Sequence, residues 1–342
     1  MNTSMKALRY EQTGSLDNLN LADVAPPTLA PGEALVQVKA AGINGSDSAG
    51  VQGWFPFVTV PRTAGRDFSG TVAQVHSDAD SEWVGAEVWG TGGDRGFAVD
   101  GTYADYVKVP VSALSRKPKS LTHVQAGSLG LPWLCAWIAV ETLAQVKKGE
   151  NVLIIGARGG IGSAAAQLCA DRGASVLGTY RTLPPSSSVP AYLTPIALSG
   201  PTAIRDAAKT AGFSNKIDVL LDCAGYEEPF NDAVGTMTPR GTGRVVVMAV
   251  HRPDGQFSMD LRAFYTRALT LKGLKSSMLD AREIKQVLDV LAQKFDSGAF
   301  EGPSEVRQVD MGDVGAVRAA LREVTERSSA VRSVIVPGGG GE

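Results

Sequence analysis

The sequence predicts an α/β protein in which a parallel, doubly wound sheet follows a mostly β module. Three observations favour this fold class. Short stretches of alternating polarity fill the first third of the chain, apolar runs alternate with helical patterns after residue 125, and a glycine-rich loop joins one of these runs to a helix. The length of 342 residues suits two domains of roughly 100–200 residues each.

The first third of the chain is expected to consist mainly of strands. Ala34–Val38 and Gly70–Val75 alternate apolar and polar side chains, which is typical of half-buried strands. Glycine and proline interrupt the segments around them, and no helical period persists there. This part of the sequence therefore predicts a β module.

After residue 125 the pattern changes to strands that alternate with helices. Gln125–Leu143 has a helical pattern despite Pro132, and Asn151–Ile155 is an apolar run that suits a strand buried on both faces. Because such alternation produces parallel sheets, we expect a doubly wound sheet here. Further strands are predicted at Ser175–Thr179, Ile217–Leu221, Arg244–Met248, Leu269–Leu271 and Val334–Val336, and further helices at Asp280–Phe295 and Val314–Glu326.

The segment Thr182–Pro201 interrupts this alternation. It contains five prolines and three successive serines, and proline lacks the N–H group that regular elements use. We therefore expect a surface excursion rather than a helix or strand. The tail Pro337–Glu342 holds four glycines and is expected to be disordered.

The composition is that of a soluble globular protein, with 44% hydrophobic and 20% charged residues. Lysine and arginine number 33 against 35 aspartates and glutamates, a net charge of −2, so we expect no nucleic-acid or anionic-membrane partner. The sequence shows no signal peptide and no apolar run of ~20 residues, which predicts a cytoplasmic protein. The cysteines Cys135, Cys169 and Cys223 are widely spaced and are expected to be buried thiols in a reducing compartment.

The glycine-rich loop is the strongest single signal in the sequence. It follows the strand at Asn151–Ile155 and opens a helix at Ser163–Arg172, which Gly173 is placed to cap. Glycines let a pyrophosphate approach the backbone, and a helix N-terminus supplies free N–H groups and a positive dipole end. This context favours dinucleotide binding over a purely structural turn. The loop residues expected to contact the cofactor are Gly156, Ala157, Arg158, Gly159, Gly160, Ile161 and Gly162.

Short-chain dehydrogenases share the glycine spacing of this loop. They carry it at the start of the chain and use a Tyr-x-x-x-Lys catalytic pair. Here the loop begins after 155 residues, and none of the seven tyrosines has lysine four positions later. The short-chain interpretation is therefore excluded.

Five motifs occur in order over nearly the whole chain: Ala41–Asp47, Ala64–Gly70, Gly101–Val107, the glycine loop and Asp222–Gly225. Together they resemble the medium-chain dehydrogenase/reductase superfamily, in its zinc-free quinone oxidoreductase and enoyl reductase branch. The resemblance implies a Rossmann NADP-binding domain, here residues 125–278, inserted into a GroES-like β-barrel catalytic domain, here 1–124 and 279–342, with the active site in the cleft. It also implies a homodimer that pairs through the strand at Leu269–Gly273.

No metal site is expected. Where zinc-dependent members of this superfamily place a catalytic cysteine and a His-Glu pair, this chain has Asn44 and Arg66-Asp67. Asparagine is a poor zinc ligand and arginine stays protonated, so this set lacks the three good ligands of a catalytic zinc site. The stretch Gly90–Gly101, which carries four cysteines in the zinc enzymes, contains none.

Without a metal, the resemblance implies a reductase that uses NADPH to reduce an electron-poor C=C bond or a quinone, because that hydride transfer needs no stabilised alkoxide. Asn44 is a candidate donor to the acceptor's carbonyl oxygen, and Ser46 a candidate proton relay. The alternative is that the Asn-Gly-Ser-Asp run is a turn with Asx-type hydrogen bonds. Tyr103 is a candidate proton donor, with packing as its alternative role. Relatives in the quinone branch carry a tyrosine where this chain has Ala49, so a mechanism based on that tyrosine does not transfer.

Further substrate-pocket residues follow from their positions. Arg66 and Asp67 are expected to form an ion pair that fills the place of the metal. Trp54, Phe55 and Phe57 are expected to line the cleft mouth, with a place in the core as the alternative.

The residues after the second strand of the Rossmann domain predict NADP(H). NAD enzymes place Asp or Glu roughly 20 residues past the glycine loop, whereas this chain has Thr179, Tyr180 and Arg181 and no carboxylate from there until Asp206. Arginine offers a fixed fork of donors to a 2′-phosphate, and a solvated surface cation is the alternative. The remaining predicted cofactor contacts are Cys223, Ala224, Gly225, Ala249 and His251.

Two other functions stay open at the level of the sequence. One is a metal-free carbonyl reductase or alcohol dehydrogenase. The other is a nucleotide-binding protein that is catalytically silent.

Overall fold

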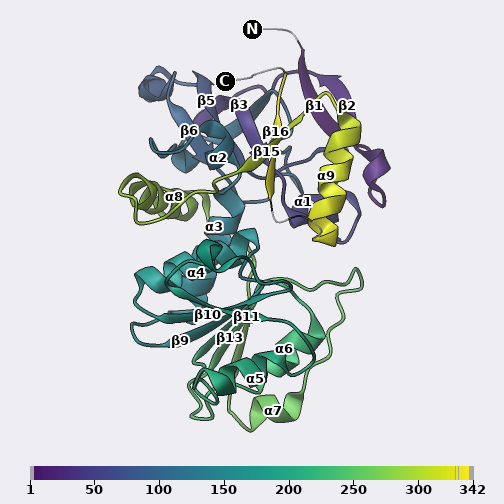
Figure 1. Ribbon diagram of the computed structural model, residues 1–342. Helices are drawn as coiled ribbons and strands as arrows, with labels where there is room; N and C mark the ends of the chain where they lie inside the picture. The colour runs from purple at the N-terminus through teal and green to yellow at the C-terminus, as the bar shows by residue number, and fades with distance from the viewer. Residues whose placement is uncertain (1–3, 328, 330, 339–342) are drawn as a thin grey trace. The chain divides into compact units, whose positions relative to one another are not determined.

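The computed structural model describes residues 4–327, 329 and 331–338, and the chain divides into two compact units (Figure 1). The first unit comprises residues 1–134 and 276–342, and the second comprises residues 135–275. The division falls within helix α3, Gly130–Trp137, whereas the sequence predicts boundaries at 124/125 and 278/279. From residue 339 on, the tail that the sequence predicts to be disordered lies outside the described residues.

The first unit is built mainly from strands, as predicted. A seven-stranded sheet has the order β15-β16-β3-β5-β6-β8, with β7 also paired to β3, and a three-stranded sheet has the order β2-β1-β4. Among the strands described in this unit, β15 and β16 form the only parallel pair. The strands are β1 Met5–Tyr10, β2 Asn20–Val24, β3 Glu33–Gly42, β4 Arg62–Thr63, β5 Phe68–Val75, β6 Glu87–Gly90, β7 Tyr106–Pro110, β8 Ser115–Arg116, β15 Val306–Asp310 and β16 Arg332–Val336.

One hydrophobic core joins the two separate stretches of the first unit. Val36 of β3 and Phe68 of β5 pack in the same buried cluster as Leu321 and Ile335 from near the C-terminus. Each such side chain contributes roughly 1.5–3 kcal/mol when fully buried, so the N-terminal and C-terminal stretches fold as one unit. The helices around this core are α1 Gly45–Val51, α2 His123–Gly127, α8 Ala281–Asp296 and α9 Val314–Glu326, with 3₁₀ turns at Leu16–Asn18, Asp78–Trp83 and Val111–Ala113.

The second unit holds a six-stranded parallel sheet of order β11-β10-β9-β12-β13-β14. This is the Rossmann strand order, and Figure 1 shows α4 on one face of the sheet and α5 and α6 on the other. The predicted doubly wound sheet is therefore confirmed. Its elements are a π-helix Ile138–Ala144, β9 Asn151–Ile155, α4 Gly160–Asp171, β10 Ser175–Tyr180, β11 Leu193–Ala197, α5 Ala203–Thr210, β12 Val219–Asp222, α6 Glu227–Val234, β13 Arg244–Val247, α7 Leu261–Tyr265 and β14 Thr270–Gly273.

The expectation of no regular element within Thr182–Pro201 is wrong. A 3₁₀ turn forms at Ser186–Ser188 and the strand β11 follows it. β11 lies at the edge of the sheet and pairs with β10. On an edge strand the backbone nitrogen of Pro195, which carries no hydrogen, can face away from the neighbouring strand, so no hydrogen bond of the sheet is lost. Leu193 and Ile196 are buried, and this burial stabilises the strand.

The opposite edge of the sheet is β14, whose four residues are all exposed. This is the strand through which the family resemblance implies pairing of two copies. The homodimer stays a prediction.

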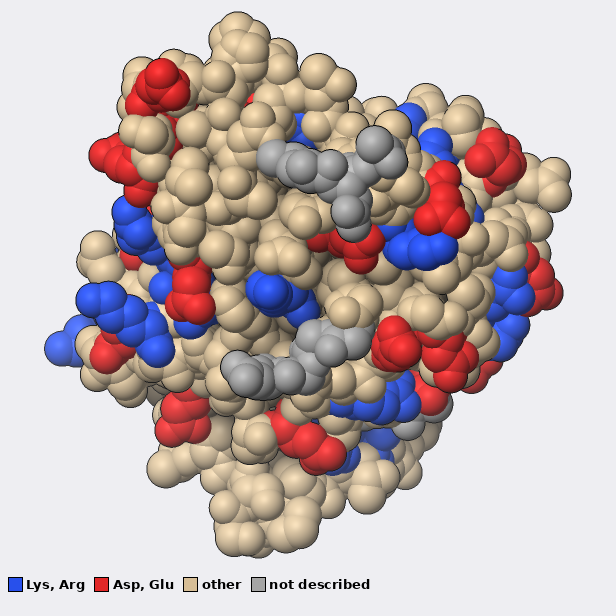
Figure 2. All heavy atoms as spheres, turned by 90° about the horizontal axis from the view of Figure 1, so that it is seen from above, with Lys and Arg blue, Asp and Glu red and all other residues tan. Residues whose placement is uncertain are grey.

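The described surface carries charges of both signs. On the face seen in Figure 2, basic and acidic side chains are interspersed, which fits the net charge of −2. Within the described residues, the helices lack the combination of length and apolarity that crossing a membrane requires.

Candidate active site

The glycine loop lies between the end of β9 and the start of α4. Gly156 has φ of +83°, a conformation that favours glycine, and its N–H donates to Thr179 Oγ1 at 3.0 Å. A Cβ atom on Gly162 would lie 2.2 Å from the Gly156 carbonyl oxygen. The first N–H groups of α4 have no intrahelical acceptor. Loop and helix therefore form a tight backbone cradle that suits an anionic group.

A second turn follows the neighbouring strand β12. Asp222 is buried, and its Oδ1 accepts hydrogen bonds from the N–H groups of Ala224 and Gly225, both at 2.9 Å. The His251 N–H donates to the Gly225 carbonyl at 3.0 Å, and a Cβ atom on Gly225 would lie 2.4 Å from the Ala249 oxygen. The predicted cofactor contacts of this region therefore gather at the carboxyl end of the parallel strands, where β9 also ends. They are Cys223, Ala224, Gly225, Ala249 and His251.

Two arginines lie at the same end of the sheet. Arg181 directly follows β10 and is exposed, as is Arg158 of the glycine loop. Burial raises the pKa of Tyr180, and the charge of Arg158 opposes that rise, so Arg158 lies near this phenol. Thr179 is buried, and its hydroxyl accepts the Gly156 N–H, so it braces the loop.

In the first unit, Asn44 lies at the centre of a buried polar cluster. It is the N-cap residue of α1 and is 5% exposed. Its Nδ2 donates to Asp67 Oδ2 at 2.9 Å, and its Oδ1 accepts from Arg332 Nη2 at 3.0 Å. Asp67 Oδ1 also accepts the Leu131 N–H at 2.8 Å. The amide is thus held between a carboxylate and a guanidinium.

Asp47 and Tyr103 form the adjoining part of this cluster. The Tyr103 hydroxyl donates to Asp47 Oδ2 at 3.0 Å, and the Asn44 N–H donates to the same oxygen at 2.8 Å. Burial, and then the charge of Asp67, raise the pKa of Asp47 to about 7. Burial also raises the pKa of Tyr103 well above its usual value. Tyr103 has no solvent exposure, which favours its packing role over proton donation.

The predicted ion pair between Arg66 and Asp67 is wrong: within the described residues these two side chains form no ion pair. Arg66 instead donates to Ser276 Oγ at 3.0 Å and to the Gly93 carbonyl at 3.1 Å, and its guanidinium lies 4.8 Å from the Phe97 ring centre. Neighbours in sequence diverge here because Asp67 points toward Asn44 and α3 while Arg66 points toward the 93–97 loop.

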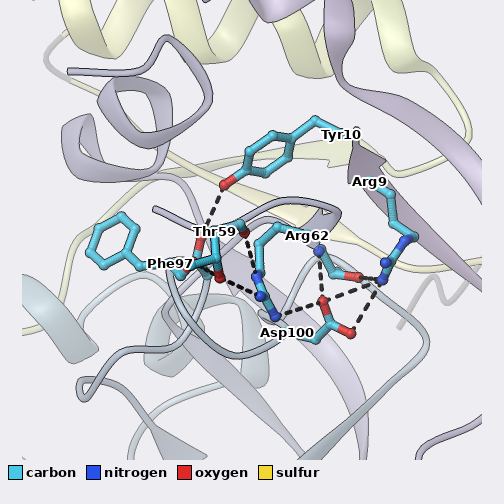
Figure 3. Close-up of polar contacts among 8 residues, drawn as sticks. Arg9, Tyr10, Thr59, Arg62, Phe97 and Asp100 are labelled. Carbon is cyan, nitrogen blue, oxygen red and sulfur yellow. Dashed lines mark hydrogen bonds and ion pairs between the residues drawn. The ribbon is translucent and has the colours of Figure 1, made fainter. Parts of the chain in front are cut away.

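The loop that carries Phe97 is tied to β1 and β4. Figure 3 shows Asp100 between Arg9 and Arg62. The Arg9 Nη1 atom lies 3.2 Å from Asp100 Oδ2, and the Arg62 Nη1 atom lies 3.4 Å from Asp100 Oδ1. The Tyr10 hydroxyl donates to the Gly96 carbonyl at 3.2 Å. These contacts hold in place the loop whose Phe97 ring and Gly93 carbonyl contact Arg66.

Comparisons with known proteins agree with this architecture. Residues 30–119 match the family model "Alcohol dehydrogenase GroES-like domain". A zinc-type alcohol dehydrogenase-like protein of Schizosaccharomyces pombe is 29% identical over 302 residues, which cover 88% of this chain and 87% of that protein. The crystal structure of an alcohol dehydrogenase superfamily protein from Novosphingobium aromaticivorans is 27% identical with a TM-score of 0.81, covering 97% of this chain and 99% of that one. The chain is therefore similar, over nearly its whole length, to alcohol dehydrogenase-type proteins of the medium-chain dehydrogenase/reductase superfamily.

Other proteins similar to this chain carry reductase names. The quinone oxidoreductase of Pongo abelii is 32% identical over 182 residues, so the match spans 52% of this chain and about half, 53%, of that relative. The 2-methylene-furan-3-one reductase of Solanum lycopersicum is 28% identical over 299 residues, covering 84% of this chain and 72% of that protein. These names agree with the branch that the motifs resemble.

The aromatic residues predicted for the substrate pocket form a cluster with Phe97. The rings of Phe55 and Phe57 stack at 5.3 Å, and each meets the Phe97 ring edge-on at 5.5–5.6 Å. Phe57 is 53% exposed, while Trp54 is half-buried. The rings of Phe55 and Phe57 therefore pack against Phe97 and still leave the Phe57 ring exposed to solvent, so the predicted pocket residues do not lie in the buried core.

The remaining sequence-based expectations have mixed outcomes. Ser46 Oγ is buried and makes no hydrogen bond within the described part of the chain. Cys135 and Cys169 are buried as expected, but Cys223 is half-buried. The sequence did not predict that Arg332 contacts Asn44, because a single arginine at the start of an apolar strand gives no indication of which distant residue it will contact.

Asp47 is expected to make the stability of this protein depend on pH. Because its pKa rises from 3.8 to about 7 on folding, the folded state holds up to one more proton than the unfolded state between these values. This stabilisation is complete below about pH 4 and is lost as the pH rises through 7. Between pH 5 and 7 the loss is about 2 kcal/mol in the free energy of unfolding.

Urea unfolding of wild type and Asp47→Asn at pH 5, 6 and 7 tests this expectation. In Asp47→Asn the free energy of unfolding should fall less steeply between pH 5 and 7, because the Asp47 contribution is absent. Asp94→Asn, which alters an exposed carboxylate, should keep the wild-type dependence on pH. Equal slopes in wild type and Asp47→Asn would contradict the assignment.

Proposed function

We propose that this protein is an NADPH-dependent reductase that acts on the C=C bond of an α,β-unsaturated carbonyl compound or on a quinone, without a metal ion. The observation that carries the proposal is the set formed by the buried Asn44 and Asp67 and the half-buried Arg332. It presents an amide donor suited to a carbonyl oxygen, and it contains no cysteine or histidine ligand.

The glycine loop of the second unit fits the cofactor. A Cβ atom on Gly162 would clash with the backbone of Gly156 and Ala157, so the start of α4 packs closely against the loop, as the last glycine of a dinucleotide-binding loop allows. Arg181 would hold the 2′-phosphate of NADPH. The turn at Cys223–Gly225, together with Ala249 and His251, would contact the remaining part of the cofactor. NADPH, when bound, supplies the hydride.

In the first unit, Asn44 would orient and polarise the acceptor. An asparagine amide has two N–H donors, and Asp67 accepts one of them. The second has no partner among the described residues and would donate to the acceptor's carbonyl oxygen, where negative charge develops during reduction. Ser46, whose buried Oγ has no partner in the described chain, is the proposed proton relay.

The chemistry of the donor groups supports the proposed metal independence. Within the described residues, no group of three His, Cys, Asp or Glu side chains is placed to hold a metal ion. Elemental analysis should find zinc far below one atom per chain, and chelator treatment should leave the reductase activity unchanged. Stoichiometric zinc, with activity lost on its removal, would contradict this prediction.

An acceptor panel with product analysis tests the proposed function. Enones and quinones are incubated with NADPH, its absorbance is followed, and the product of each enone is identified. A saturated ketone supports C=C reduction, while an allylic alcohol indicates a metal-free carbonyl reductase. NADPH binding without oxidation across the panel would indicate a catalytically silent nucleotide-binding protein.

A further inference from the structure

Arg332 is the first residue of β16, and its guanidinium reaches two other elements of the first unit. Nη2 donates to the Ser128 backbone carbonyl at 2.8 Å, and Nε donates to that Ser128 carbonyl at 3.2 Å. Nη2 also donates to Asn44 Oδ1 at 3.0 Å. Ser128 is the C-cap residue of α2, and Asn44 is the N-cap residue of α1. Arg332 therefore connects the strand near the C-terminus to the candidate active site.

The two charged neighbours allow the Asn44 amide only one orientation. Its oxygen faces the Arg332 cation, and its NH₂ group faces the Asp67 carboxylate. A flipped amide would set its NH₂ group against the guanidinium and its oxygen against the carboxylate, replacing two attractive contacts with two repulsive ones. Asn44 and Asp67 are both buried, so water cannot screen these contacts effectively.

We propose that Arg332 is a positioning residue that holds the Asn44 amide with an N–H, and not its oxygen, available to the acceptor. The inference rests on the proposed function for its consequence in catalysis. Without Arg332, the amide loses the cation that fixes its oxygen, and Asp67 alone holds it, so the second N–H is no longer held toward the acceptor. A hydrogen-bond donor to a developing oxyanion is typically worth about 10²–10³ in kcat.

The kinetic test compares Arg332→Met, Asn44→Ala and the double variant with wild type. Asn44→Ala should lower kcat about 10²- to 10³-fold and Arg332→Met roughly 10- to 100-fold, with the NADPH dissociation constant changed less than twofold in each. The double variant should be no slower than the slower single variant, because both changes remove the same donor. Added guanidinium ion should restore part of the activity of Arg332→Met but none of Asn44→Ala.

Arg307→Met is the matched control. Arg307 lies on the neighbouring strand β15 and donates to Glu323 and Ser333, so its loss removes a comparable side chain from the same sheet. This variant should retain the wild-type kcat.

A second readout does not depend on turnover. In protein labelled with ¹⁵N at asparagine, the two Nδ2 protons of Asn44 should give distinct, slowly exchanging signals in wild type and Arg307→Met. In Arg332→Met these signals should broaden and exchange faster. This measurement decides the positioning role even if wild type reduces no acceptor, which would instead refute the proposed function.

Several outcomes would overturn the proposal. They are unchanged Asn44 signals in Arg332→Met, a double variant whose loss equals the product of the single losses, or weaker NADPH binding with kcat intact. If Arg332→Met does not fold, Arg332→Lys replaces it. One ammonium group cannot reproduce the guanidinium fork, so kcat should fall at least threefold, and a wild-type kcat with unchanged Asn44 signals would refute the role.

Discussion

Gly162→Ala is expected to weaken NADPH binding by at least two orders of magnitude. The added Cβ would lie 2.2 Å from the Gly156 oxygen and 2.9 Å from the Ala157 Cα. Both neighbours are backbone atoms of the loop itself, so the clash cannot be relieved by turning a side chain. α4 and the loop must separate, and the cradle that would receive the pyrophosphate opens. A hundredfold loss corresponds to about 2.7 kcal/mol in the free energy of binding.

Titration calorimetry with NADPH measures this effect. Gly200→Ala is the control, because a Cβ on that exposed glycine of the same unit meets no atom within 4 Å, and its affinity should match wild type. Circular dichroism and the melting temperature show whether each variant is folded. A folded Gly162→Ala protein with wild-type affinity would mean that the loop does not bind the cofactor.

Arg181→Ala is expected to erase most of the preference for NADPH over NADH. A charge-assisted contact to the 2′-phosphate is worth about 1.5–3 kcal/mol, which corresponds to roughly 10- to 150-fold in affinity. Wild type should therefore favour NADPH by at least tenfold, chiefly through KM. Because NADH has no 2′-phosphate, the variant should use NADH as wild type does.

The measurement is kcat/KM for each cofactor in wild type and variants. Arg158→Ala tests the other exposed arginine at this end of the sheet, whose charge acts on Tyr180, and a small additional loss is expected there. Arg240→Ala removes an exposed arginine that precedes β13, at the opposite end of the parallel strands, and should change nothing. Equal use of both cofactors by wild type, or a preference retained by Arg181→Ala, would refute the assignment.

Local sequence patterns were sufficient to predict most of the second unit. The apolar run at Asn151–Ile155, the glycines that follow it and the alternation of strands with helices are such patterns, and they set local structure. The edge strand β11 could not be predicted in this way, because proline opposes regular structure locally. Only the place at the end of the sheet lets Leu193 and Ile196 be buried while Pro195 needs no donor.

The candidate active site depended far more on tertiary structure. Motif resemblance singled out Asn44, Arg66 and Asp67, but which of them touch was decided by the packing of α1, α3 and β16. Asp67 binds Asn44 and not Arg66, and the cation on Asn44 comes from Arg332, 288 residues away along the chain. No periodicity or spacing encodes such a contact. Burial decides it, because an amide and a carboxylate removed from water must find partners among whichever elements the fold brings together.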